Sequence, residues 1–224
     1  MVSAGAIRGA ETMTGRIAII GTAGRRDDAA RLSREIYDRM YACTLEAIEE
    51  WGTAEAVSGL AAYADHLAVR AFLDGKLEAL DLRAPAHWDV AGKRFVPNPA
   101  IQFNPGRTLN SYHQAFGRVV GIDPFEEIAR AFEMGATLTV AEGFHRRNKD
   151  VADLATHMLA FTFGDDVAPV DVAPDDPGFR SSGEAGLKDG GTADTWRSAW
   201  RCDAKRHVSL TWLATAPAPQ GRAP

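Results

Sequence analysis

Short apolar runs alternate along the chain with longer stretches in which apolar residues recur every three or four positions. Each apolar run predicts a buried strand of a parallel sheet, and each three-or-four spacing predicts a helix with one apolar face. This alternation predicts an α/β fold: a Rossmann-like open parallel sheet with helices on both faces, joined by right-handed crossovers. The predicted strands span residues 16–20, 55–57, 77–82, 136–140, 158–163 and 208–213.

The helices predicted between these strands have ends that are marked by known signals. One ends at Gly52, and its apolar face comprises Leu32, Ile36, Met40, Cys43 and Ala47. Another has the capping-box spacing from Asp123 to Glu126, with proline at its first helical position, and it ends before Gly135. Further helices are predicted at 65–73, 108–119, 148–157 and from about Thr192 onward, the last carrying Trp196 and Trp200.

Residues 16–213 form one predicted domain that two irregular stretches interrupt. Residues 84–121 hold four prolines and break the strand–helix rhythm, so we expect an insertion over the site or a dimer contact. Residues 164–189 are rich in Asp, Pro, Gly and Ser and predict a long acidic loop. Residues 1–15, which lack the layout of a signal peptide, predict a loose tail, and the Pro/Ala/Gly-rich residues 214–224 predict a disordered one.

Four turns rich in glycine or small residues follow apolar runs and precede predicted helices. They span residues 21–26, 58–65, 143–148 and 190–195. In an open parallel sheet the carboxyl ends of the strands share one edge, where helix N-termini present free N–H groups. Four such turns at one edge predict an anion site of the size of a nucleotide.

The third turn carries the clearest cationic signal. Arg146 and Arg147 lie where a helix begins, and a guanidinium matches phosphate oxygens with two parallel hydrogen bonds. Asn148 either caps that helix or holds a loop. The competing interpretation is a solvated basic turn beside an ordinary cap, and spacing alone leaves both open.

Composition narrows the class of protein. Of 224 residues, 46% are hydrophobic and 25% are charged, which suits a globular domain with a sizeable core. A net charge of -5 argues against a dedicated nucleic-acid coat, and no apolar run approaches the ~18 residues of a membrane span. The two cysteines fit no disulfide framework, which favours a reducing, cytoplasmic compartment. The six histidines lack zinc-ligand spacing, so neither a metal nor a cofactor is expected.

Three of the four turns resemble motifs of one superfamily. Phe144-x-Arg146-Arg147-Asn148 resembles the Phe-Pro-x-Arg-Asn-Arg segment of DNA-processing protein A. Gly190-Gly191-Thr192 resembles the glycine-rich turn of the LONELY GUY nucleotide hydrolases, and Ser58-Gly59-x-Ala61 with Ala64-Asp65 resembles a segment of small bacterial relatives. These proteins belong to the SLOG superfamily of Rossmann-like nucleotide binders and N-glycoside hydrolases. The resemblance touches most of residues 16–213, apart from the insertion and the acidic loop.

The resemblance implies roles for individual residues at this edge of the sheet. Asp65 would bind ribose hydroxyls or, alternatively, cap the helix that begins there. Arg147 would lie beside the phosphate or the glycosidic bond, with Asn148 next to it. A cradle of backbone N–H groups for the phosphate would be formed by Gly190, Gly191 and Thr192. The remaining ligand-binding positions implied by the first two turns are Gly21, Thr22, Gly24, Arg25, Ser58 and Gly59.

One departure from the LONELY GUY pattern bears on catalysis. In those hydrolases the glycine turn continues as Gly-Thr-x-x-Glu and the glutamate performs acid–base work, whereas Thr195 occupies that position here. Asp194, one residue earlier, or Glu142, before the arginine turn, would have to serve as the catalytic carboxylate. Asp194 is the preferred candidate. The alternative for Asp194 is a helix-start carboxylate that only complements the dipole.

Three functions stay open at this point. The first is an enzyme that hydrolyses or transfers at the N-glycosidic bond of a nucleotide or nucleotide derivative. The second is a non-catalytic sensor or sequestering module for a nucleotide-derived signal, which the missing glutamate favours. The third is a DNA-processing protein, which the acidic balance disfavours. We expect a small-molecule partner and a homo-oligomer whose contact uses residues 84–121 or the helix carrying Trp196 and Trp200.

Overall fold

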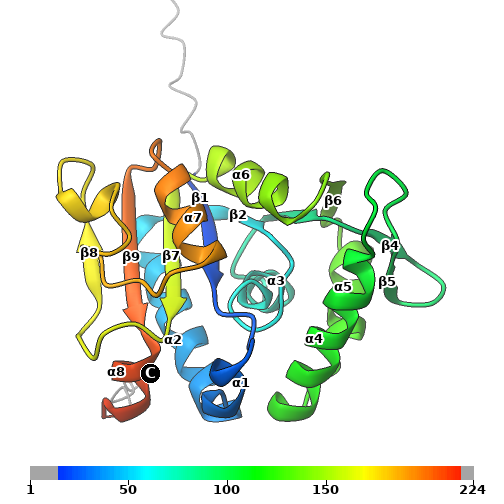
Figure 1. Ribbon diagram of the computed structural model, residues 1–224, viewed down its shortest axis with the longest axis horizontal. Helices are drawn as coiled ribbons and strands as arrows, with labels where there is room; N and C mark the ends of the chain where they lie inside the picture. Colours follow the sequence, from blue (N-terminus) through cyan, green and yellow to red (C-terminus); the bar gives the residue numbers. More distant parts are fainter. Residues whose placement is uncertain (1–14, 218–224) are drawn as a thin grey trace, which may run out of the picture.

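Six parallel strands and one antiparallel edge strand form the central sheet of the computed structural model, which describes residues 15–217 (Figure 1). The strand order is β6-β3-β2-β1-β7-β9-β8, and a separate hairpin pairs β4 with β5. This architecture confirms the predicted Rossmann-like open sheet. The strands are β1 (Gly15–Gly21), β2 (Thr53–Ser58), β3 (Ala79–Ala84), β4 (His87–Asp89), β5 (Arg94–Val96), β6 (Thr137–Val140), β7 (His157–Thr162), β8 (Val170–Val172) and β9 (Ala204–Ser209).

Helices cover both faces of this sheet. Ile17 and Ile19 of β1 pack into a core with α2, α3, α4 and α5, whereas Ala18 and Ile20 face α6 and α7. Figure 1 shows α6 and α7 together on one side of the strands. The helices are α1 (Asp27–Arg31), α2 (Arg34–Trp51), α3 (His66–Leu73), α4 (Pro105–Val120), α5 (Pro124–Glu133), α6 (Phe144–Leu154), η1 (Pro177–Phe179, a 3-10 turn), α7 (Gly191–Ser198) and α8 (Leu210–Thr215).

The order of the strands creates a switch point beside β1. The chain runs outward from β1 through β2 and β3 to β6, and then returns to add β7 on the other side of β1. Gly21 at the end of β1 therefore pairs with Phe161 near the end of β7. Ligands of open α/β sheets bind outside the carboxyl ends of the strands at such a switch point.

Local sequence signals fixed several helix ends. Gly52 adopts a left-handed conformation (φ 60°) and its amide bonds the carbonyl groups of Ile48 and Glu49, which ends α2 as predicted. The Asp123 side chain accepts hydrogen bonds from the amides of Phe125 and Glu126, with proline at the first position of α5. These two predictions are confirmed.

Other boundaries differ from those that the sequence predicts. The last strand is residues 204–209, and residues 210–215 form α8, because Ser209 accepts a hydrogen bond from the Trp212 amide and caps a helix there. α6 begins at Phe144, and His157 is the first residue of β7 and not the end of a helix. Residues 1–14 and 218–224, which hold most of both predicted tails, lie outside the described residues.

The two stretches predicted as irregular contain more regular structure than predicted, although α4 confirms the helix predicted at 108–119. Residues 84–121 include the β4–β5 hairpin and α4, whose Leu109 and Phe116 are buried in the main core. The acidic loop contributes β8, which pairs antiparallel with β9, and η1. Trp196 is fully buried and its indole N–H bonds the Gly178 carbonyl 2.9 Å away, so α7 holds this loop against the sheet.

Candidate functional site

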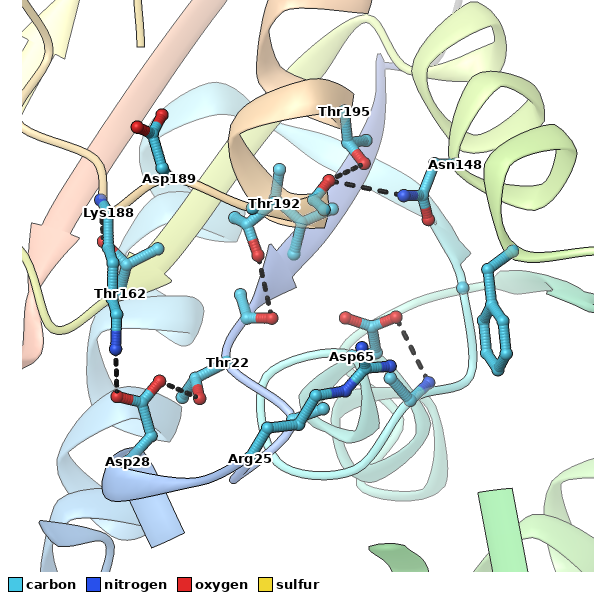
Figure 2. A pocket seen from close by; sticks show the side chains of 18 of the residues that line it. Thr22, Arg25, Asp28, Asp65, Asn148, Thr162, Lys188, Asp189, Thr192 and Thr195 are labelled. Atoms are coloured by element: carbon cyan, nitrogen blue, oxygen red, sulfur yellow. Dashed lines mark hydrogen bonds and ion pairs between the residues drawn. The ribbon is translucent and has the colours of Figure 1, made fainter. Parts of the chain in front are cut away.

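A pocket of about 550 Å³ opens at the carboxyl ends of β1 and β7 (Figure 2). This volume lies within the ~300–1,000 Å³ that is usual for small-molecule sites. The wall is built from the turn after β1, the loop after β2, the start of α6, the end of β7 and the start of α7. All four of the predicted turns therefore contribute to one cavity.

The turn after β1 is fixed by a network that reaches across the chain. The Thr22 hydroxyl donates to Asp28 (2.9 Å), and the Lys188 ammonium pairs with the other carboxylate oxygen of Asp28 (2.7 Å). The backbone passes so close to β7 that a Cβ atom on Gly21 would lie 2.3 Å from the carbonyl oxygen of Phe161. Only glycine fits at position 21, so the turn and the 188–192 segment are held at a fixed separation.

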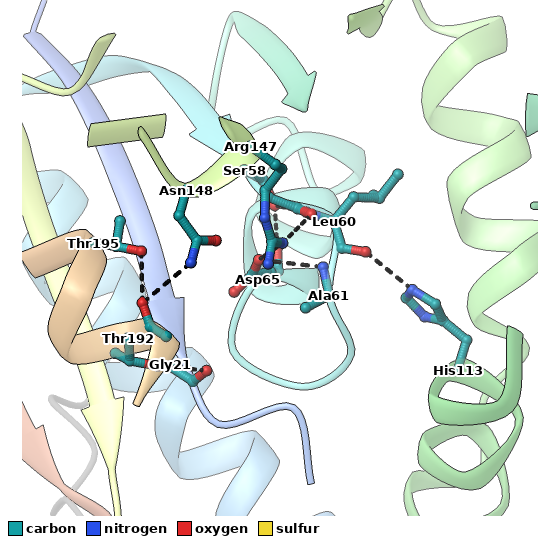
Figure 3. Close-up of polar contacts among 12 residues, drawn as sticks. Gly21, Ser58, Leu60, Ala61, Asp65, His113, Arg147, Asn148, Thr192 and Thr195 are labelled. Atoms are coloured by element: carbon teal, nitrogen blue, oxygen red, sulfur yellow. Dashed lines mark hydrogen bonds and ion pairs between the residues drawn. The ribbon is translucent and has the colours of Figure 1, made fainter. Parts of the chain in front are cut away.

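The loop after β2 is held in an unusual conformation. Leu60 and Tyr63 have positive φ angles of 54° and 60°, and each costs about 1–3 kcal/mol that the surroundings must offset. The Ser58 hydroxyl accepts from the Leu60 amide (3.1 Å) and donates to the Asp65 carbonyl (2.8 Å). The imidazole Nε2 of His113 on α4 lies 3.3 Å from the Leu60 carbonyl oxygen (Figure 3). The Ser58 hydroxyl therefore stabilises this conformation of the loop.

A buried ion pair forms the floor of the pocket. Arg147 Nη1 lies 3.3 Å from Asp65 Oδ2 and also donates to the Gly59 carbonyl, while the Ala61 amide donates to Asp65 Oδ2 (3.2 Å) (Figure 3). Both side chains are more than nine-tenths buried. Burial raises the pKa of the Asp65 carboxyl, which the nearby Arg147 charge opposes, and burial lowers the pKa of Arg147. Arg147 Nε is buried and has no hydrogen-bond partner among residues 15–217.

Two helices begin at the pocket without a side-chain cap from the described residues. Gly143 before α6 and Gly190 before α7 have positive φ angles of 96° and 137°. The first amides of a helix have no intrahelical acceptor, so both starts offer free donors and the positive end of a dipole. The start of α7 is tied to its neighbours because Thr192 donates to the Gly21 carbonyl (3.0 Å), and Asn148 donates to the Gly191 carbonyl (3.3 Å).

Arg25 lies across the mouth of the pocket. Figure 2 shows its side chain extending from the turn after β1 toward Asp65, and its charge acts on the carboxyl of Asp65 and on the Arg147 guanidinium. Arg25 and Arg26 line the pocket without an ion-pair partner in the described part of the chain. Lys188 and Arg147, the other two cations of the wall, are paired with carboxylates. Asp27 and Asp189 also line the pocket without an ion-pair partner in residues 15–217, so its wall holds four cations and four carboxylates, and the two helix N-termini add positive potential to it.

Most residues of the predicted ligand-binding set line this pocket, but two of them only support it. The Gly24 amide donates a hydrogen bond to the Thr22 hydroxyl (3.1 Å), and Ser58 holds the loop after β2. Neither residue is among those that line the pocket. The remaining members of the set are brought together: Gly21, Thr22, Arg25, Gly59, Asp65, Arg147, Asn148, Gly190, Gly191 and Thr192.

The structure does not bring the two predicted catalytic carboxylates to the pocket. Asp194 is exposed on α7 and pairs with Arg197 one turn along the helix, and Glu142 is exposed before α6; neither is part of the described lining. His145, within the arginine turn, is exposed and also outside it. Asp65 did not cap its helix through its side chain. It is instead the carboxylate buried in the floor.

Sequence reasoning missed several members of the wall. Asp28 and Lys188 are 160 residues apart, and nothing local predicts their ion pair. Thr162 and Thr195 are buried and line the pocket, and the position of Thr162 at the end of a predicted strand was the available signal. Asp189 also lines it. Within residues 15–217, no cluster of three or more His, Cys, Asp or Glu side chains has the arrangement to hold a metal ion.

Comparison with known proteins gives a family but no activity. The chain is 30% identical over 156 residues to the uncharacterized protein R261 of Acanthamoeba polyphaga mimivirus, a match that covers 66% of this chain and 82% of the viral protein. The chain belongs to the same family as that viral protein. No protein-family profile matches the chain, and no solved structure matches it. Among the described helices, none is both long and apolar enough to span a membrane.

Proposed function

We propose that this chain, as a member of the family of the mimivirus protein, binds a nucleotide or nucleotide derivative with its phosphate between the starts of α6 and α7. The observation that carries the proposal is the buried Arg147, whose Nε lacks a partner among the described residues while its helix start and that of α7 lack side-chain caps. A buried donor without a partner calls for an explanation, and at the wall of a pocket a bound acceptor is one that can be tested. A phosphate oxygen is the acceptor that suits guanidinium and helix amides together.

Electrostatics support phosphate over a neutral ligand. Each helix start carries the equivalent of about half a positive charge, and the free cations Arg25 and Arg26 add to it. The carboxylates Asp28 and Asp65 are paired with Lys188 and Arg147, so they oppose an anion less than free carboxylates would, while Asp27 and Asp189 offset the charge of Arg25 and Arg26 and leave the helix starts as the net attraction. The SLOG resemblance predicts the same kind of ligand, and the gathering of all four turns around one pocket is consistent with it.

Binding without turnover is the form of this function that we favour. Thr195, which stands where the LONELY GUY pattern has its glutamate, uses its hydroxyl to bond the Gly191 carbonyl (2.8 Å). Asp194 and Glu142 are exposed outside the described lining of the pocket. A sensor or sequestering module for a nucleotide signal needs no carboxylate beside the glycosidic bond.

Cleavage of an N-glycosidic bond is the second candidate, and Asp65 is the observation that favours it. Its carboxyl lines the pocket, and burial raises its pKa, which is the direction that suits a general acid or base. In this version Asp65 performs the role that the sequence assigned to Asp194 or Glu142. A DNA-processing role receives no comparable support from the pocket, which is sized for a small molecule.

The test is to incubate the protein with a panel of nucleotides and measure retained ligand and released base by mass spectrometry. The proposal predicts retention without base release; release that Asp65→Asn abolishes and Asp194→Asn leaves intact selects the enzyme. Asn148→Asp places a negative charge beside the α7 start and should weaken binding by about tenfold or more. Gln114→Glu adds the same charge at an exposed position of α4 outside the pocket and should change binding less than about threefold. Retention of no nucleotide contradicts the proposal.

We also propose a cytoplasmic homo-oligomer as the setting of this site. Cys43 and Cys202 are free thiols, as a reducing compartment allows. The prediction that one helix carries both tryptophans is wrong, because α7 ends at Ser198 and Trp200 lies beyond it. Trp196 is fully buried, so a contact beside α7 would have to use Trp200, which is 53% exposed, and the alternative contact is residues 84–121. Light scattering at tens of micromolar checks this, and a monomer there contradicts it.

A further inference from the structure

One aromatic side chain lies in the wall of the pocket, whose other lining residues are polar, charged, glycine or aliphatic. Phe144, the first residue of α6, lines the pocket and is half-buried. Phe103, from the segment before α4, stacks on Phe144 with ring centroids 6.1 Å apart and an interplanar angle of 19°. The ring of Phe144 is thereby backed by a second ring and held at a fixed position beside the helix start.

The guanidinium of Arg25 lies over the ring of Phe144. Arg25 Cζ is 5.8 Å from the centroid of Phe144 and 5.0 Å from that of Tyr112 on α4. Both distances fall within the ~6 Å range of a cation–π contact. Arg25 is exposed and has no ion-pair partner in residues 15–217, so these contacts alone hold it there and it can move. A planar cation lies over the ring at this place, and the same place can accept another planar group.

We propose that Phe144 is the stacking platform for the base of the bound nucleotide, with Arg25 covering the other face of that base. The inference rests on the proposed function, because it takes the phosphate at the starts of α6 and α7 as given. A base at van der Waals distance from both groups requires about 7 Å between ring and guanidinium, roughly 1 Å more than the present separation. Arg25 supplies that movement from an exposed side chain, while the backed Phe144 stays in place.

The position of Phe144 explains how one ligand reaches both ends of the pocket. The residue begins α6, so the backbone that presents amides to the phosphate also sets the ring. Arg147, three residues further along the same helix, lies with its Cζ 5.6 Å from the Phe144 ring. Tyr112, whose ring also contacts Arg25, comes from the 84–121 stretch. That stretch therefore acquires a role: it supplies Tyr112 and Phe103 to the base end of the site.

The test compares AMP with ribose 5-phosphate, which has the same phosphate and sugar but no base, by calorimetric titration. Phe144→Leu keeps an apolar side chain and removes the ring. We expect it to weaken AMP by about 5- to 100-fold, the usual effect of losing one base–aromatic stack, and to leave ribose 5-phosphate within about twofold. Phe144→Tyr keeps the ring and should retain the affinity of the wild type for AMP. Trp212→Leu removes a half-buried aromatic on α8, outside the pocket, and serves as the control.

Each result has a distinct meaning. Equal affinity of Phe144→Leu and wild type for AMP overturns the stacking role while the proposed function stands. Parallel loss of AMP and ribose 5-phosphate in Phe144→Leu also overturns it, because the ring would then matter only to the shape of the helix start. If wild type binds neither probe nor any other nucleotide of the panel, the proposed function fails and the base platform fails with it.

Discussion

Replacing Arg147 with methionine tests the buried pair that forms the floor of the site. Met is similar in length but carries no charge, so Asp65 would remain buried without its counter-ion, and the Gly59 carbonyl would lose a donor. Removing one partner of a buried pair usually costs about 3–5 kcal/mol. Asp65 can escape part of that cost by binding a proton.

The cost of that proton sets the magnitude and its pH dependence. With an unfolded-state pKa near 3.9 and 1.36 kcal/mol per pKa unit, protonating Asp65 costs about 4 kcal/mol at pH 7 and about 1.5 kcal/mol at pH 5. The folded-state pKa of Asp65 is raised in the variant, so the destabilisation is smallest at low pH and grows as pH rises. We therefore expect Arg147→Met to lower the free energy of unfolding by about 3–4 kcal/mol at pH 7 and about 2 kcal/mol at pH 5.

Chemical denaturation measures this effect on five proteins: wild type, Arg147→Met, Asp65→Asn, the double variant and a control. In the Asp65→Asn background the same change at position 147 should cost only about 1–2 kcal/mol, because no charge is left behind. Arg146→Met is the matched control: Arg146 is exposed and pairs with Asp150 one turn along α6, so its loss should cost less than about 0.5 kcal/mol. A cost for Arg147→Met that is equal at pH 5 and pH 7, or equal to that of Arg146→Met, would refute the buried-pair account.

Two further predictions concern the elements that hold the site. Gly21→Ala should lower the free energy of unfolding by about 1–3 kcal/mol, because the new Cβ atom meets the Phe161 carbonyl. Gly183 has open space around it, so Gly183→Ala should change the free energy of unfolding by less than about 0.5 kcal/mol. Equal effects of the two substitutions in thermal denaturation would contradict the close approach at Gly21. Burial lowers the pKa of His113 to about 4, so the unfolded chain binds more protons below its usual pKa, and stability is lost as pH falls from 7 toward 4. His113→Gln should remove about 2 kcal/mol of the loss between pH 7 and pH 5, and an unchanged pH dependence of unfolding would show that His113 is not held neutral.

The fold was largely predictable because it is encoded in short, local signals. The alternation of apolar runs and helical spacing gave the parallel sheet, and Gly52 and the Asp123 cap marked helix ends that the structure confirms. The last strand was predicted too far along the chain because Ser209 and Thr211 alternate with apolar residues between Val208 and Trp212. That alternation is typical of a strand, and it did not reveal that Ser209 caps a short helix.

The sequence predicted the backbone turns of the site better than the positions of its side chains. Glycine turns after strands located the pocket, since the topology brings all strand ends to one edge. Asp194 was placed near the ligand from its distance to the turn, but the face of α7 on which it lies depends on how the helix packs. The Asp28–Lys188 pair and the contact of Arg25 with Tyr112 join distant segments, and only the folded chain brings those together.

A crystal structure determined after soaking crystals of the protein in AMP tests most directly whether the pocket binds a nucleotide. The account predicts the phosphate within hydrogen-bond distance of the Gly191 and Thr192 amides, with the Arg147 side chain beside it and the base on the Phe144 side of the same pocket. A phosphate bound away from the starts of α6 and α7, or a pocket that stays empty at millimolar AMP, would contradict it.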